Sequence, residues 1–350
     1  MLKSLQKAFK VKEVRDRLLY TFMMLVVIRI GCCLPIPGVD PSYLHDFFSN
    51  LQNSGMGFFN AITGGSFSSM SIFALSITPY ITSSIIMQLL TIAIPKLEEM
   101  QKDGEDGRKK IAEYTRYLTV GLALFESCAM AVGLGGKGLL LEDHRNIWGY
   151  LTVVAAMTAG SALLMWIGER ITDNGVGNGI SIVLLINIVS GTPQDMMTLY
   201  ERFMAGRSVA VATVSGIIVL AIIVAIVVFV LVLNDAERRI PVQYSKKMQG
   251  RRMIGGQSTY IPLKVNTANV IPVIFASSIM SMPVMIAQFF HVDYSTIGGK
   301  ILLALSSSNW FKPEAPAYSI GMLVYIVLVV LFAYFYTSIT FNPLEVANNM

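Results

Sequence analysis

The chain has 350 residues, of which 54% are hydrophobic and 14% are charged, and its formal net charge at pH 7 is +5. Ordinary soluble domains carry about 25% charged residues, so this composition excludes that class and predicts a membrane protein with several spans. The net positive charge is mainly a signal of topology, because the cations gather in a few of the loops between apolar runs.

Eight apolar runs are long enough to cross a bilayer as helices, since a span needs about 20 residues. They are Leu18–Leu34, Ile72–Ile94, Tyr117–Leu134, Tyr150–Ile167, Ile180–Met197, Val211–Leu233, Val270–Phe290 and Tyr318–Phe341. The fifth run is the weakest, because Asn187, Gly191 and Pro193 interrupt it. The predicted fold class is therefore an all-α, polytopic membrane protein.

The segment before the first span, residues 1–17, contains six cations. No small-residue cleavage site follows the first apolar run, so this run is predicted to be a span and not a signal peptide. With residues 1–17 in the cytosol, 20 of the 27 Lys and Arg face inward, six face outward and Arg29 lies within the first span. The positive-inside rule therefore predicts a multi-pass protein with a cytosolic N-terminus.

Residues 35–71 form the first outer connection, which holds no Lys or Arg but several glycines and apolar side chains. A solvated loop does not need so many apolar residues. Two interpretations stay open. The segment folds back among the spans, where its backbone is buried in protein or lines a water-filled cavity, or it lies on the membrane interface.

The second and seventh spans share a pattern in which a proline is followed two residues later by an isoleucine and then by paired serines. The prolines are Pro79 and Pro272. Because proline removes a backbone hydrogen bond, the pattern predicts helices that are weakened at these positions and able to move. The similarity also fits an internal repeat, for which chance is an equal explanation.

The loop 234–269, between the sixth and seventh spans, is strongly basic. It holds seven cations against two acids, Asp235 and Glu237. On the cytosolic side such a loop fixes the topology, and it also offers a surface to an acidic partner.

Few groups in the sequence suit catalysis or cofactor binding. Gly135–Lys137 and Gly298–Lys300 lack the spacing of a phosphate-binding loop, and the three histidines have no acid, Cys or His at ligand spacing. Arg29 and Glu126 are the ionisable groups that stand out within spans. We therefore expect no cofactor, no metal and no enzymatic activity. The functional alternatives are a channel that reads no specific ion, a small-solute secondary transporter and a structural scaffold.

Several long strings of residues are more specific than any single motif. They are Pro35–Asp40, Gly107–Lys110, Tyr114–Tyr117, Gly177–Ser181, Arg238–Tyr244, Gly255–Tyr260 and Phe341–Pro343. In this order, along the whole chain, they strongly resemble the SecY family, the central subunits of bacterial protein-conducting channels. The resemblance implies a clamshell of ten helices in two inverted-repeat halves with a re-entrant plug. This chain would comprise a first half at 18–197 and an incomplete second half at 211–350, and would lack the last two spans.

In that family a ring of apolar side chains forms the waist of the pore. Five residues here match ring positions: Ile77, Ile81, Ile180, Leu184 and Ile274. The first two are four residues apart, as are the next two, so each pair shares a helix face. An apolar waist excludes ions by dewetting and offers no fixed hydrogen bond to a passing peptide.

The resemblance also implies a plug and a lateral gate. The plug, at about 55–70, would comprise Gly55, Phe58, Phe59, Asn60, Ile62, Gly64, Gly65 and Phe67. Its glycines would permit a short, weakly held helix. The second and seventh spans would form the gate, with the polar residues Thr82, Gln88, Asn269, Ser277 and Ser278. Signal sequences would enter there, and nascent membrane segments would leave for the lipid.

The basic loop would dock the ribosome and the SecA motor. The docking residues would be Arg238, Arg239, Lys246, Lys247, Arg251 and Arg252. Cations gain affinity for ribosomal RNA because they release counterions from its phosphates. The alternative is a loop that only sets topology. The resemblance further implies SecE and SecG as partner subunits, the bacterial plasma membrane as location, and the conduction of unfolded polypeptides as function.

Overall fold

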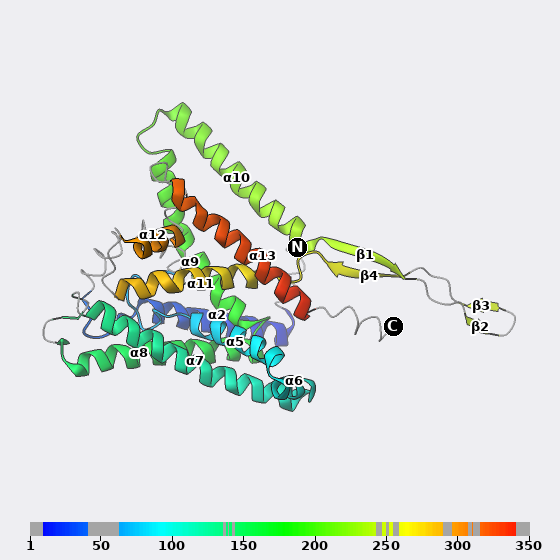
Figure 1. Cartoon of the computed structure of the whole chain (residues 1–350). Helices are drawn as coiled ribbons and strands as arrows, with labels where there is room; N and C mark the ends of the chain where they lie inside the picture. The colour runs from blue at the N-terminus through cyan, green and yellow to red at the C-terminus, as the bar shows by residue number, and fades with distance from the viewer. Residues whose placement is uncertain are drawn as a thin grey trace. The chain divides into compact units, whose positions relative to one another are not determined.

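The computed structural model describes residues 10–40, 63–135, 138, 140–141, 144–242, 247–249, 252–254, 259–289, 296–306, 310 and 316–340. Most of them lie in α-helices (Figure 1). The helices are α2 (Lys12–Cys33), α5 (Thr78–Ala93), α6 (Pro95–Lys102), α7 (Glu105–Leu134), α8 (Ile147–Asn174), α9 (Gly179–Phe203), α10 (Val209–Asp235), α11 (Ile271–Phe289), α12 (Ile297–Leu305) and α13 (Ile320–Thr340). Each predicted span overlaps one of these helices, so the helical fold class is confirmed.

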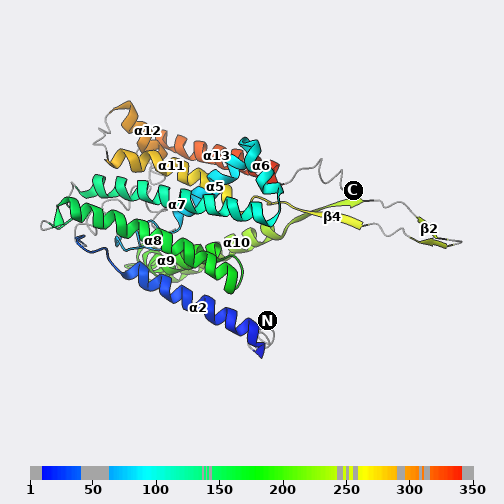
Figure 2. The ribbon, with the colours of Figure 1, turned by 90° about the horizontal axis from the view of Figure 1, so that it is seen from below.

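The chain divides into two compact units. The first comprises Met1–Pro193 and Ile279–Met322, and the second comprises Gln194–Ser278 and Leu323–Met350. Within the first unit, α7 packs against α5 and α8, and α8 also packs against α2 (Figure 2).

Four of the described helices are long and apolar enough to cross a membrane. They are Ile147–Asn174, Gly179–Phe203, Val209–Asp235 and Ala317–Ser338. A fifth candidate combines α5 and α6, which meet at a bend of 103° next to Pro95. The other predicted spans lie in α2 and α7, whose first turns are charged, and in α11, where the described apolar helix is shorter. These spanning helices make the chain a membrane protein.

Two predictions about individual spans are wrong. The second span was expected to be helical from Ile72, but residues 72–77 form turns and α5 begins at Thr78. Pro79 and Pro272 were expected to weaken their helices, yet each is the second residue of its helix, α5 or α11. A proline in the first turn removes no hydrogen bond of the helix, since the first N–H groups have no partner within it.

The fifth predicted span is more regular than its interrupted apolar run suggests. It lies in α9, which is one continuous helix of 25 residues with Pro193 inside it. Neighbouring structure therefore overrides the interruption that the polar residues suggested.

Two apolar clusters form the described core of the first unit. One surrounds Phe67 and Met70 and includes Val153 and Met157 of α8. The other surrounds Ile77 and joins α2, α5, α8 and α9. Residues 63–77, which we call the connecting segment, lead from one cluster to the other and into α5.

Gly160 of α8 allows the connecting segment to approach the helix, because a Cβ at this position would collide with the carbonyl oxygen of Ile72. We expect Gly160→Ala to destabilise the protein by about 1–3 kcal/mol, since backbone atoms cannot move aside cheaply. Gly121→Ala is the matched control, because Gly121 has open space around it and alanine favours a helix by about 1 kcal/mol. Thermal unfolding in detergent measures both changes, and equal midpoints for the two variants would contradict the prediction.

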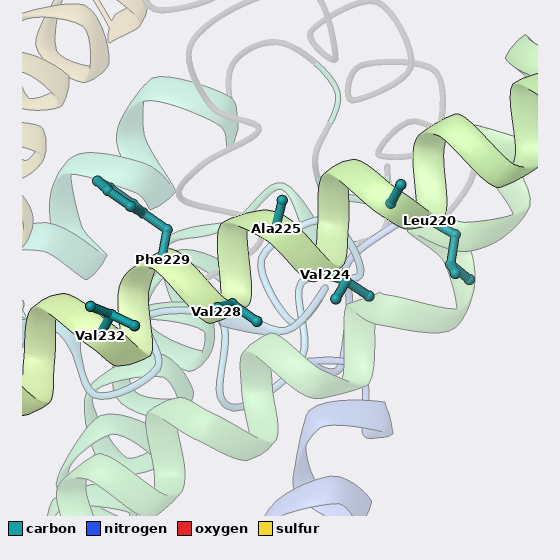
Figure 3. Close-up of a pocket in the computed structure, with 7 residues that line it drawn as sticks. Leu220, Val224, Ala225, Val228, Phe229 and Val232 are labelled. Carbon is teal, nitrogen blue, oxygen red and sulfur yellow. The ribbon is translucent and has the colours of Figure 1, made fainter.

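The second unit contains α10 and the strands that follow it (Figure 1). The apolar part of α10 has a mean hydropathy of 3.6, and none of it is buried. An open groove along the helix is lined by seven apolar side chains of α10 itself, among them Leu220, Val224 and Phe229 (Figure 3). A helix that is apolar on all sides and unburied within its own chain suits a lipid environment.

The basic loop contains strands that were not predicted. β1 (Glu237–Val242) pairs antiparallel with β4 (Thr259–Lys264), and β2 (Lys247–Gln249) pairs antiparallel with β3 (Arg252–Ile254). The β1–β4 pair follows directly on α10 (Figure 1), and we call the segment 237–264, which holds both pairs, the arm.

Candidate functional site

Four of the five predicted ring residues come together in the first unit. Ile77 is fully buried, and Ile81, Ile180 and Leu184 are partly buried against the same apolar cluster. A Cβ built on Gly168 of α8 would lie 3.5 Å from a side-chain carbon of Ile77 and 3.5 Å from one of Ile180. The start of α5 and the start of α9 therefore meet through apolar side chains.

Ile274, the fifth predicted ring residue, lies in the second unit and in the first turn of α11. It is partly buried, and its backbone N–H donates to the carbonyl oxygen of Val270 at 3.2 Å. The ring of five stays a prediction, supported by the four neighbours in the first unit.

The predicted plug is described only at its C-terminal end. Gly55, Phe58, Phe59, Asn60 and Ile62 lie outside the described residues. Gly64 and Gly65 have φ angles of 65° and 82°, which glycine adopts without steric cost. Phe67 is 1% exposed, in the cluster that includes side chains of α7 and α8. The described end of the predicted plug, residues 64–70, therefore consists of turns anchored in the core.

The predicted gate residues are divided between the units. Thr82 lies on α5, where its hydroxyl donates to the carbonyl oxygen of Thr78 at 3.1 Å, and Gln88 is exposed on the same helix. Ser277 of α11 likewise donates to the carbonyl oxygen of Val273, at 2.7 Å. The threonine and serine hydroxyls are thus satisfied within their own helices.

The remaining gate residues flank the start of α11 or lie within it. Asn269 is exposed two residues before α11, with a φ angle of 52°. Its backbone N–H donates to Asn266 Oδ1 at 3.0 Å. Ser278 is partly buried on α11. The assignment of all five residues to a gate stays a prediction.

The paired strands of the basic loop place its cations in defined positions. Arg238 and Arg239 are exposed on β1, and they point to opposite faces because neighbours on a strand alternate. The Arg239 guanidinium lies 4.7 Å from the ring centre of Tyr260 on β4, a cation–π contact.

Two of the remaining predicted docking residues lie on the second strand pair, β2 and β3. Lys247 begins β2 and Arg252 begins β3, and the connection between these strands is the two residues 250–251. Arg251 is thus part of the connection, and together with Lys246 it lies outside the described residues.

Loops predicted to share a membrane side lie together in the first unit. On the predicted inner side, Arg17 of α2 donates to the carbonyl oxygen of Gly175 between α8 and α9 at 3.5 Å. Arg116 Nε donates to Glu169 Oε1 at 2.8 Å, and this carboxylate raises the pKa of the guanidinium.

On the predicted outer side, Val39 forms a β-bridge with Leu140. In the same contact, the N–H of Leu141 donates to the carbonyl oxygen of Gly38 at 3.1 Å. The contacts at both ends of the unit agree with the expected pairing of these loops on shared sides of the membrane, and the orientation stays a prediction.

The sequence matches one family of known proteins. Residues 71–350 match the SecY family. The chain is 44% identical to the protein translocase subunit SecY of Streptomyces scabiei, over 100% of this chain and 79% of that protein. The chain belongs to the SecY family. It is also 40% identical to the protein translocase subunit SecY of Corynebacterium glutamicum, over 98% of this chain and 78% of that protein.

Solved structures of protein-conducting channels share the fold at 20% sequence identity. One is a SecY protein whose plug domain stabilises the closed state of the translocation channel, with a TM-score of 0.58 over 92% of this chain and 72% of that chain. Another is the channel of the canine ribosome-channel complex from the endoplasmic reticulum, with a TM-score of 0.57 over 95% of this chain and 75% of that chain. The expected channel fold is therefore confirmed.

Family membership decides between the functional classes that composition left open. The SecY family consists of translocase channel subunits and is not a family of enzymes. The matches lend no support to a small-solute secondary transporter.

Proposed function

We propose that the chain is the pore-forming subunit of a protein translocase, which conducts unfolded polypeptides and releases membrane segments sideways into lipid. The observation that carries this function is the packing of Ile77, Ile81, Ile180 and Leu184 in one apolar cluster, in a chain of the SecY family. Such a constriction offers no ligand to an ion or solute, yet it seals against water by dewetting. A channel for chains of any sequence needs this combination.

In this proposal the halves at 18–197 and 211–350 enclose the pore, and Ile274 completes the side of the ring that the second half supplies. The segment 55–70 plugs the pore from outside. α5 and α11 form the lateral gate, and its polar residues allow the two helices to separate at low cost. These residues are Thr82, Gln88, Asn269, Ser277 and Ser278.

The proposed location is a bacterial plasma membrane, with the N-terminus in the cytosol. The charge asymmetry supports this orientation, because 20 of 27 Lys and Arg then lie on the cytosolic side. The contacts of Arg17 with Gly175 and of Arg116 with Glu169 support the assignment of these segments to one shared side, and the charge asymmetry indicates which side that is.

The proposed partners follow from the basic arm and from the family. SecE and SecG are the partner subunits, and the ribosome and the SecA motor supply the energy for movement. Arg238 and Arg239 are exposed on the β1–β4 pair, which suits them to contacts with RNA phosphates or acidic side chains.

Reconstituted vesicles test the proposed function. Vesicles that contain the full-length protein with its partner subunits should protect an unfolded secretory precursor from external protease when SecA and ATP are supplied. Vesicles without the protein are the control. Absence of protection, together with accumulation of a small solute that depends on the protein, would overturn the proposal and favour the secondary transporter.

A further inference from the structure

Hydrogen bonds made by polar side chains join three separate parts of the first unit. Arg29 of α2 donates from Nη1 to Ser190 Oγ on α9 at 2.9 Å. Ser190 in turn donates to the carbonyl oxygen of Asn187 at 2.6 Å, and Asn187 Nδ2 donates to Ser76 Oγ at 3.0 Å. The connecting segment is thereby tied through α9 to α2.

The inner part of this chain of hydrogen bonds is buried. Asn187, Ser76 and Ser161 are each 1% exposed, and the Ser161 hydroxyl on α8 donates to the carbonyl oxygen of Ser76 at 3.2 Å. In an apolar surrounding a polar group is costly unless it is paired, so each of these bonds resists separation of the connecting segment from α8 and α9.

Gly64, at the other end of the connecting segment, lies against the same part of α9. A Cβ at Gly64 would lie 2.9 Å from the Cα and the carbonyl oxygen of Asn187, and also 2.9 Å from Ser190 Oγ. Contact at both Gly64 and Ser76 means that α9 holds both ends of the connecting segment, from the described end of the predicted plug to the start of α5.

The connecting segment adopts an unfavourable conformation where it is held. Met70 and Ser76 have φ angles of 41° and 53°, in the left-handed region that residues with a side chain rarely adopt. Two buried polar atoms, Asn187 Oδ1 and Thr78 Oγ1 directly after the connecting segment, have no hydrogen-bond partner among the described residues. Such a segment relaxes to other conformations once its contacts are broken.

We propose that Arg29, Ser190 and Asn187 form a latch that holds the connecting segment, which includes the described end of the predicted plug, in place in the closed channel. The role of the latch in closing the channel rests on the proposed function, whereas the contacts themselves do not depend on it. Opening breaks the bond between Asn187 and Ser76, and the strained backbone at Ser76 then favours the released state.

Amide hydrogen exchange of the purified full-length protein tests the contact independently of transport. Asn187→Leu keeps the size of the side chain but removes its amide, and we expect exchange of residues 63–77 to rise about tenfold, as the loss of one buried hydrogen bond predicts. Ser190→Ala should act in the same direction, and Ser190→Thr, which keeps the hydroxyl, should restore protection. Thr198→Val is the matched control, because the Thr198 hydroxyl bonds to Gln194 within α9.

Unchanged exchange in both Asn187→Leu and Ser190→Ala would overturn the latch. An equal rise throughout α8 and α9 would also overturn it, because that result reports general loosening of the fold. Ion leak from vesicles containing the same variants then tests the role in closing. Faster exchange with a larger leak supports the proposal, whereas faster exchange in tightly sealed vesicles overturns the gating role. Failure of the unmodified protein to protect a precursor would instead contradict the proposed function.

Discussion

Replacement of Ile81 with Asn in the assembled channel is expected to raise the ion leak of the resting state by about tenfold or more. Ile81 packs beside Ile77 in the apolar cluster where α5 meets α9. Burial of an amide without a partner costs about 1–3 kcal/mol, and about 1.4 kcal/mol shifts an equilibrium tenfold. The amide also binds water at the constriction, which weakens dewetting. The closed state therefore loses stability and its seal together.

Conductance of planar bilayers and export of precursors with defective signal sequences measure this effect. A channel that opens more easily should tolerate weaker signal sequences, so both readouts should rise. Ile81→Val is the control, because it keeps an apolar, β-branched side chain and should leave leak near the unmodified level. Ile274→Asn should behave like Ile81→Asn if Ile274 completes the ring. Unchanged leak and unchanged signal-sequence tolerance in both Asn variants would contradict the ring assignment.

The apolar pattern predicted the positions of the helices well. Residues Val211–Leu233 were expected to span, and α10 covers them completely, because nothing in that run competes with a helix. The ring pairs were also predictable in part. A spacing of four residues places Ile180 and Leu184 on one face of α9, but only the folded chain shows that this face meets Ile77.

The turns of the connecting segment were not predictable from the same pattern. Residues 72–77 are as apolar as the helix that follows, so hydropathy extends the second span through them. The backbone departs from a helix there because contacts distant in sequence, from Asn187 and Ser161 to Ser76, hold a left-handed residue. Asn187 interrupts an apolar run in the sequence, and this polar residue is the signal from which the proposed latch could be predicted.

The strands of the basic loop were missed for a different reason. Seven cations dominate the composition of residues 234–269, and this charge is a stronger signal than the short alternation of polar and apolar residues that indicates strands. Val and Ile in β1 and Thr, Tyr and Ile in β4 are nevertheless residues that favour strands. The pairing of Arg238 with Leu263 depends on a register that only the antiparallel partner fixes.

Reversal of Arg251 and Arg252 to Glu is expected to weaken ribosome binding by about tenfold or more at moderate salt. Two cations that each neutralise an RNA phosphate contribute about 1.4 to the slope of log affinity against log salt, at about 0.7 per contact. The variant should therefore bind more weakly and with a smaller salt dependence. Sedimentation of ribosomes with the detergent-solubilised channel, repeated over a series of salt concentrations, measures both quantities.

The matched control reverses Arg202 and Arg207, which changes the net charge by the same amount on the predicted outer side. These cations are exposed, so their reversal should leave the fold and ribosome binding unchanged. An equal loss in both double variants would show that net charge, and not the arm, attracts the ribosome. The variant with Arg251 and Arg252 reversed could also bind ribosomes as tightly as the unmodified protein at every salt concentration. That result would contradict the docking role and would mean that these cations only set the topology. If only the reversal of Arg251 and Arg252 weakens ribosome binding, these two positions contact RNA phosphate, since all other cations of that variant are unchanged.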